Sequence, residues 1–170
     1  MSIHFGQFVV TQQVFFRSKH SYGLVNLKPL LPGHVLVCPY RVVSRVSDLS
    51  DEEAADFFLA VKKVSGVIEK VYDAQALNIA IQDGPLAGQS VPHVHCHIIP
   101  RKFKDLPNVD DIYQLIDSKD GDLELSFQQM KNLATRMPSP DVPDSIRQPR
   151  TLEDMVAEAQ LLESQMKARL

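Results

Sequence analysis

The sequence has little cysteine, no tryptophan and no long apolar run. Its two cysteines, Cys38 and Cys96, are widely separated and form no Cys-x-x-Cys pair, which excludes a disulfide-rich scaffold and favours free thiols in a reducing compartment. We therefore expect a cytoplasmic protein, with a nuclear location also open. No apolar run approaches the roughly 20 residues that cross a bilayer, and the start MSIHFGQFVV does not resemble a signal peptide. We expect no membrane partner.

An excess of either charge is also absent. The 170 residues include 18 Lys and Arg against 21 Asp and Glu, for a formal net charge of -3. Such a chain has no general attraction for a phosphate polymer, so we expect no nucleic-acid partner. With 44% hydrophobic residues, the composition is that of a globular protein with one core and a tail.

Short β-branched and aromatic segments between Gly and Pro residues predict about five strands. In residues 76–82, Leu77, Ile79 and Ile81 alternate with Asn78 and Ala80, which is the period of a half-buried strand. Gln82 at its end should face away from the packed side. The predicted strands are residues 14–18, 22–26, 34–38, 76–82 and 91–100.

Two longer segments have the period of amphipathic helices. Phe57, Val61, Val64 and Ile68 recur at spacings of three and four after a Ser-Asp-Glu-Glu capping box at 50–53. Residues 151–169 begin with Thr-x-x-Asp and carry a second apolar stripe, so residues 151–170 are predicted to be a C-terminal docking helix. Whether this helix packs on its own chain or on a partner stays open.

The stretch between these parts is polar and rich in proline. We predict a short helix near residues 109–117 and a flexible, Pro-containing linker over residues 119–150. Residues 1–118 then form the main domain of an α+β protein.

The most informative segment is PHVHCHIIP at residues 92–100, where His93, His95 and His97 alternate with apolar residues. On a strand, residues two apart point the same way, so the three imidazoles share one face and the apolar side chains occupy the other. Three titratable rings on one face of a strand are rarely an incidental feature of the surface. Two kinds of chemistry use such an arrangement.

The first explanation is a metal site, since neutral imidazole is a common transition-metal ligand. Arg101 and Lys102 stand where a carboxylate would complete the set of ligands, so we expect no metal ion held by the protein itself. The second is covalent catalysis. A neutral histidine is already a nucleophile near its reference pKa of about 6.5 and can carry a phosphoryl or nucleotidyl group.

Neighbouring residues favour phosphorus chemistry. Gln82 ends the adjacent predicted strand, and Gln89 lies in the Gly/Pro loop directly before the histidines. Their amides can donate hydrogen bonds to phosphate oxygens without adding charge.

These residues resemble the histidine triad superfamily, whose signature is His-x-His-x-His followed by apolar residues. Within it, the fragile histidine triad branch of dinucleoside polyphosphate hydrolases, the diadenosine triphosphatases, is most similar, through NLKP at 26–29, PGHVLVCP at 32–39 and QDGPLAGQ at 82–89. The resemblance covers about residues 2–118. It implies a small antiparallel sheet with one main helix packed on it, in a catalytic domain whose sheet continues across a homodimer.

The resemblance also implies a reaction. His95 would attack the α-phosphorus of diadenosine triphosphate and expel ADP, and water would then hydrolyse the nucleotidyl-histidine to AMP. A divalent cation, Mg²⁺ or Mn²⁺, would arrive with the polyphosphate, and no organic cofactor is implied. The remaining roles by family position are these: His93 and His97 orient the nucleophile and stabilise phosphoryl oxygens, Gln82 and Gln89 bind phosphates, Asn26 lies on the ribose side, and His34 is a supporting histidine.

Two other functions remain open from the sequence. GQSV at 88–91 together with the histidines also resembles nucleoside phosphoramidases of the same superfamily. The protein could instead be a nucleotide-binding signalling module in which slow hydrolysis acts as a timer.

Overall fold

Five antiparallel strands form the main sheet, in the order β3-β4-β5-β7-β6. In the computed structural model, which describes residues 1–118, 122–133 and 150–169, two further strands form a separate hairpin. The α+β fold expected from the sequence is confirmed. The strands are β1 (His4–Phe5), β2 (Phe8–Val9), β3 (Val14–Arg17), β4 (Ser21–Val25), β5 (Val35–Pro39), β6 (Ala76–Ile81) and β7 (Cys96–Arg101).

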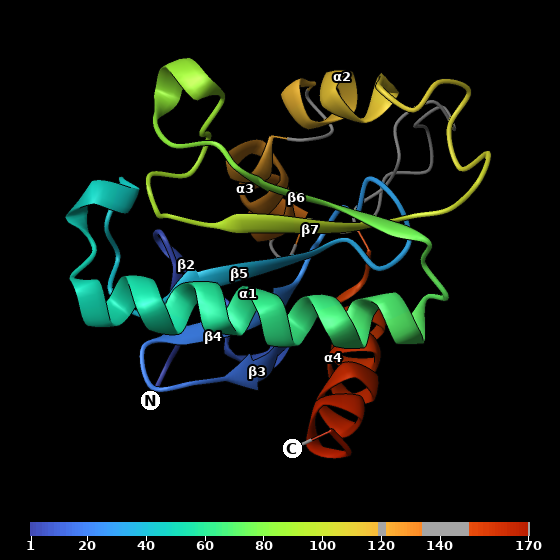
Figure 1. Ribbon diagram of the computed structural model, residues 1–170. Helices are drawn as coiled ribbons and strands as arrows, with labels where there is room; N and C mark the ends of the chain where they lie inside the picture. Colours follow the sequence, from blue (N-terminus) through green and yellow to red (C-terminus); the bar gives the residue numbers. More distant parts are fainter. Residues whose placement is uncertain (119–121, 134–149, 170) are drawn as a thin grey trace.

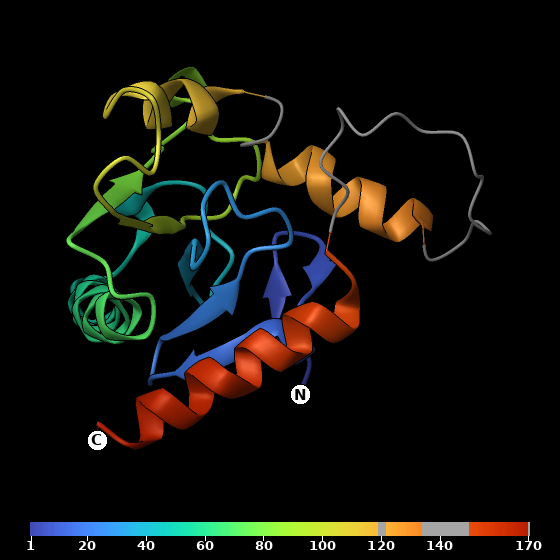
Figure 2. The same ribbon diagram turned by 90° about the vertical axis from the view of Figure 1, so that its right-hand side faces the viewer.

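Helices cover both faces of this sheet (Figures 1 and 2). The helices are α1 (Asp51–Val71), α2 (Asp111–Asp117), α3 (Leu123–Leu133) and α4 (Leu152–Lys167). Helices α1 and α4 share one apolar core with the sheet, and the β1–β2 hairpin and α3 share a second core on the other face. Helix α2 packs through a third, smaller cluster around Ile99, Ile112 and Ile116.

Strand β5 shows how the period of two builds these layers. Val35 and Val37 belong to the core under α1 and α4, while Leu36 and Cys38 belong to the core under the hairpin and α3. Because successive side chains point to opposite faces, a central strand covered on both sides is apolar throughout.

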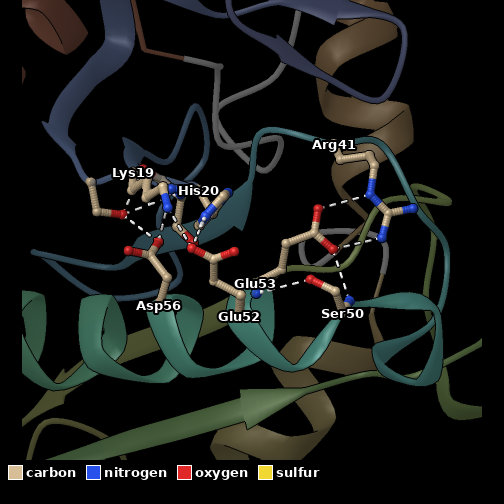
Figure 3. A network of polar contacts seen from close by, with 9 residues as sticks. Lys19, His20, Arg41, Ser50, Glu52, Glu53 and Asp56 are labelled. Carbon is tan, nitrogen blue, oxygen red and sulfur yellow. Dashed lines mark hydrogen bonds and ion pairs between the residues drawn. The ribbon is translucent and has the colours of Figure 1, made fainter.

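Helix α1 begins at the predicted capping box (Figure 3). The Ser50 hydroxyl accepts from the Glu53 N–H at 3.2 Å, and Glu53 accepts from the Ser50 N–H at 2.8 Å. One turn further, the Asp56 carboxylate accepts from the His20 N–H at 3.1 Å and from the Ser18 hydroxyl at 2.6 Å. These bonds fasten the β3–β4 turn to the helix.

The strand predicted over residues 91–100 begins too early, since β7 starts at Cys96. β5 pairs with β7 only from Val37 opposite Cys96 onwards, so earlier residues have no ladder partner in β5. Instead the Val94 N–H donates to the Val43 carbonyl at 2.7 Å. Strand β6 also differs from prediction, because Ile79 is 51% exposed on this edge strand.

Helix α3 corrects the predicted linker. Leu123 and Phe127, one helical turn apart, are buried in the core shared with the β1–β2 hairpin. Together with Met130 they recur at spacings of four and three, so the sequence does contain a helical period here. The polar and proline-rich surroundings obscured this period. Residues 119–121 and 134–149 of the predicted linker lie outside the described residues. The short helix expected near 109–117 is present as α2.

Helix α4 packs on its own chain. Met155, Ala159, Leu162 and Met166 enter the core under α1, and the helix lies against β3. Most of the stripe predicted from the sequence is therefore the buried face, although Leu152 at its start is 47% exposed. None of the helices in the described parts of the chain is long and apolar enough to span a membrane.

Candidate active site

Four histidines gather on the sheet face that the β1–β2 hairpin covers. His97 lies in β7 opposite Leu36, His34 directly precedes β5, and His93 and His95 lie in the extended segment before β7. Although these two precede the strand, the alternation persists: Val94 and Cys96 point into the core under α1. All four histidines are at most 1% exposed.

His93 has both ring nitrogens occupied by backbone groups. Its Nδ1 accepts from the Gly6 N–H at 3.0 Å, so Nε2 carries the proton and donates to the Pro39 carbonyl at 2.8 Å. Gly6 has a φ of +56°, and a Cβ there would lie 2.7 Å from a Val91 methyl. The hairpin turn can therefore bring this N–H to His93 only with glycine at position 6.

His95 is oriented by the residue two positions before it. Its Nδ1 lies 2.7 Å from the His93 carbonyl oxygen and must donate to it, which leaves the Nε2 atom with its lone pair. The rings of Phe5 and His95 are in T-shaped contact, with their centroids 5.3 Å apart. The same hydrogen bond would stabilise the positive charge that forms on the ring when Nε2 attacks an electrophile.

His34 and His97 form a directed pair across adjacent strands. The Leu30 N–H donates to His34 Nδ1 at 3.1 Å, so His34 Nε2 carries a proton and donates to His97 Nδ1 at 2.9 Å. The proton of His97 is therefore on Nε2, which is buried and has no hydrogen-bond partner among the described residues. The hydrogen-bonding capacity of this N–H is therefore unsatisfied within the described residues.

Burial keeps these rings neutral. It lowers the pKa of His34 to about 3 and that of His93 to about 4. It also lowers the pKa of His95, and that of His97 to well below its usual value. A nucleophile in this site needs no base to deprotonate it at neutral pH.

The same hydrogen bonds argue against a metal centre built from these rings. Both nitrogens of His93 and one each of His95 and His97 are already in use. Within the described residues, no group of three His, Cys, Asp or Glu side chains is arranged to hold a metal ion.

The three polar residues expected to bind substrate lie on separate segments. Asn26 is buried beside His34, with its amide nitrogen 3.4 Å from the imidazole, and its Oδ1 accepts from the Lys28 N–H at 3.2 Å. Gln89 donates to the Ser44 carbonyl at 2.7 Å. Gln82 follows β6 and donates to Asp117, at the end of α2, at 3.1 Å.

Three residues near the site were not identified from the sequence, namely Phe8, Phe127 and Arg150. Phe127 of α3 stacks on Phe8 and contacts Phe5, which in turn lies against His93 and His95. Arg150 hydrogen-bonds to the carbonyl of Asn26. In the sequence, Arg150 is marked only by its position directly before the Thr-x-x-Asp motif that starts α4.

Comparison with known proteins agrees with this geometry. Residues 7–104 match the HIT domain. The chain is similar to the bis(5'-nucleosyl)-tetraphosphatase (asymmetrical) of Schizosaccharomyces pombe, with 48% identity over 167 residues, 94% of this chain and 92% of the relative. It is also similar to the bifunctional bis(5'-adenosyl)-triphosphatase/adenylylsulfatase FHIT of Arabidopsis thaliana, with 43% identity over 154 residues, 90% of this chain and 85% of the relative.

A solved structure has a similar fold. The diadenosine triphosphate hydrolase of Plasmodium falciparum, in complex with cyclomarin A, superposes with a TM-score of 0.70 at 30% identity, covering 99% of this chain and 86% of that one. The predicted relationship to the fragile histidine triad branch is thereby confirmed. The chain belongs to the HIT domain family.

Proposed function

We propose that this protein hydrolyses dinucleoside polyphosphates of the diadenosine triphosphate type through a nucleotidyl-histidine on His95. The observation that carries the proposal is the 2.7 Å contact from His95 Nδ1 to the His93 carbonyl, because it leaves Nε2 as a neutral nucleophile. The names of the relatives, a triphosphatase and a tetraphosphatase, support the substrate class.

The reaction consists of two displacements. His95 Nε2 forms a bond to the α-phosphorus, the bond from that phosphorus to the bridging oxygen breaks, and ADP leaves with the electron pair. Water then attacks the same phosphorus, the P–N bond breaks, and AMP is released. The proton on Nδ1 stays bonded to the His93 carbonyl throughout, which stabilises the imidazolium of the intermediate.

The surrounding groups stabilise charge on the phosphates. His97 donates its free Nε2–H to a phosphoryl or leaving oxygen, in the direction that the His34 hydrogen bond dictates. The Gln82 and Gln89 amides exchange their present acceptors for phosphate oxygens, and Asn26 contributes on the ribose side. Mg²⁺ or Mn²⁺ enters as the counterion of the polyphosphate and is part of the substrate.

We also propose that two copies pair through β6. This strand forms one edge of the sheet and no described strand pairs with its outer side, whereas the opposite edge strand, β3, lies against α4. An open edge with an exposed Ile79 can continue the sheet into a second copy.

The proposal is tested by product analysis. The wild-type protein and the variant His95→Ala are incubated with Mg²⁺ and either diadenosine triphosphate, diadenosine tetraphosphate or adenosine phosphoramidate, and nucleotides are separated by ion exchange. We expect equal AMP and ADP from the triphosphate, AMP and ATP from the tetraphosphate, and a loss of turnover of at least about 10³-fold in the variant. Rapid-quench mass spectrometry should detect one nucleotidyl group on the wild-type chain.

Three outcomes contradict parts of the proposal. Substantial hydrolysis by a correctly folded His95→Ala variant would remove His95 from the role of nucleophile. Cleavage of the phosphoramidate with both dinucleotides untouched would assign the protein to the phosphoramidases. Tight nucleotide binding with no turnover of any of the three compounds would favour a signalling module.

A further inference from the structure

Arg150, directly before the cap of α4, contacts the connection that follows β4. Its backbone N–H donates to the Leu27 carbonyl at 3.3 Å, and its guanidinium donates to the Asn26 carbonyl. The guanidinium also forms an ion pair with Glu158, nearly two turns into α4. Residues 124 positions apart in the sequence are thus joined by a charged side chain that is only 25% exposed.

Glu158 is itself held from the other side. One carboxylate oxygen accepts from Arg150, and the other accepts from the hydroxyl of Tyr72, the residue directly after the end of α1. The Glu158 side chain is 13% exposed, so the ion pair is shielded and its geometry is restricted. Arg150, Glu158 and Tyr72 form a clamp between the ends of two helices and the segment 26–28.

The clamped segment leads directly to the histidines. Asn26 Oδ1 accepts from the Lys28 N–H, and two residues later the Leu30 N–H donates to His34 Nδ1 at 3.1 Å. That donor decides which nitrogen of His34 carries the proton, and the His34 proton in turn decides where His97 carries its own. A shift of this segment would disturb both rings although no residue of the clamp contacts them.

We propose that Arg150 is a positioning residue, which acts through the backbone of residues 26–30 to hold His34 and His97 in the directed pair that presents the His97 Nε2–H to the substrate. This inference rests on the proposed function for its catalytic consequence, but its structural part does not. The positive charge of Arg150 also helps to keep His34 neutral, because it lowers the pKa of His34 in addition to the effect of burial.

The structural part is tested by NMR on histidine labelled with ¹⁵N. In the wild type, the buried His34 Nε2–H should give a slowly exchanging signal, assigned by its loss in His34→Asn. In Arg150→Gln we expect this proton to exchange at least tenfold faster, with far-ultraviolet circular dichroism unchanged. Glu163→Gln, which breaks an exposed ion pair with Lys167 on the same helix, is the matched control and should leave the signal as it is.

The catalytic part is tested by a double-mutant cycle with diadenosine triphosphate and Mg²⁺. We expect Arg150→Gln to lower kcat about tenfold with KM changed less than twofold, and Arg150→Lys to recover part of the loss. In a His34→Asn background the same Arg150→Gln change should alter kcat less than twofold, because the residue through which it acts is gone.

The outcomes separate the two proposals. Equal losses in both backgrounds, or an unchanged exchange rate of the His34 proton, would overturn the positioning role. A rise in KM alone would make Arg150 a substrate contact instead. If the wild type hydrolyses no dinucleotide, the proposed function fails while the NMR comparison still decides the structural claim. If Arg150→Gln does not fold, Glu158→Gln replaces it in both experiments with the same expected directions.

Discussion

At the scale of single residues, hydrogen-bond direction defines this site more than charge does. The backbone of Gly6 and Leu30 donates to one nitrogen of His93 and His34 respectively, and each ring then has one remaining proton with one destination. Neutral rings with assigned protons are suited to a nucleophile and a donor that work beside an anionic substrate.

The buried histidines predict a specific pH dependence of stability. Because the folded-state pKa values of His34 (about 3) and His93 (about 4) lie below the unfolded value of 6.5, the unfolded chain binds more protons below pH 6.5. The free energy of unfolding should therefore fall as pH falls from 6.5 toward the folded-state pKa values of about 4 and 3, by up to roughly 1.4 kcal/mol per pH unit for each ring. Well above pH 6.5, where the unfolded histidines are also neutral, these groups contribute no slope.

Urea unfolding followed by circular dichroism at several pH values measures this slope. His34→Asn should have a smaller slope than the wild type over the same window, whatever its absolute stability. Equal slopes in the two proteins would show that His34 is not held neutral by the fold.

At the scale of elements, helices α1 and α3 differ in how much they depend on local sequence motifs and how much on tertiary packing. The start of helix α1 is specified by neighbouring residues, since Ser50 and Glu53 cap each other. Arg41 also donates to both carboxylate oxygens of Glu53, at 2.8 and 2.6 Å (Figure 3). Helix α3, by contrast, depends on Phe127 finding the aromatic rings of the β1–β2 hairpin. The start of α1 is marked by a local capping motif, whereas the apolar period of α3 does not reveal which surface the helix packs against.

Ser50→Ala should lower the free energy of unfolding by about 1 kcal/mol, because the Glu53 N–H loses its acceptor at the first turn of α1. The cap contacts none of the four buried histidines, so kcat and KM should stay within twofold of the wild type. Chemical denaturation and steady-state kinetics check the two halves. Ser50→Asp keeps an acceptor and should recover most of the stability, and a large kcat loss in Ser50→Ala would contradict the separation of cap and site.

At the scale of the whole molecule, the sheet has two unlike edges. The β3 edge lies against α4, whose Met155 and Leu162 are fully buried, while β6 has Ile79 half-exposed. The unpaired N–H and C=O groups of an open edge strand can pair with a strand of another chain.

Ile79→Asp should therefore convert a dimer into a monomer at micromolar concentration, because it places a charge in the interface that the continued sheet would bury. Sedimentation velocity measures the change. Leu161→Asp is the control, since Leu161 is 50% exposed on α4, away from β6, and should leave the dimer intact. A wild-type protein that sediments as a monomer would refute pairing through β6.

The sequence by itself determined the elements whose cause is local. The apolar stripes and caps of α1 and α4, the central strands, and the alternation of His93, His95 and His97 with core residues all follow from periods of 3.6 and 2 and from capping residues. The resemblance to a known family then indicated the class of chemistry, because the His-x-His-x-His motif at residues 93–97 is specific to that family.

Only the tertiary structure decided the protonation pattern and the supports of the site. His34 and His97 are 63 residues apart, and Gly6 and His93 are 87 apart. Which imidazole nitrogen carries a proton depends on donors and acceptors that arrive from distant backbone, and these have no signature at the histidines themselves. The start of β7 at Cys96, the exposure of Ile79 and the clamp at Arg150 have the same origin: each depends on where a partner strand or helix ends, which no local pattern contains.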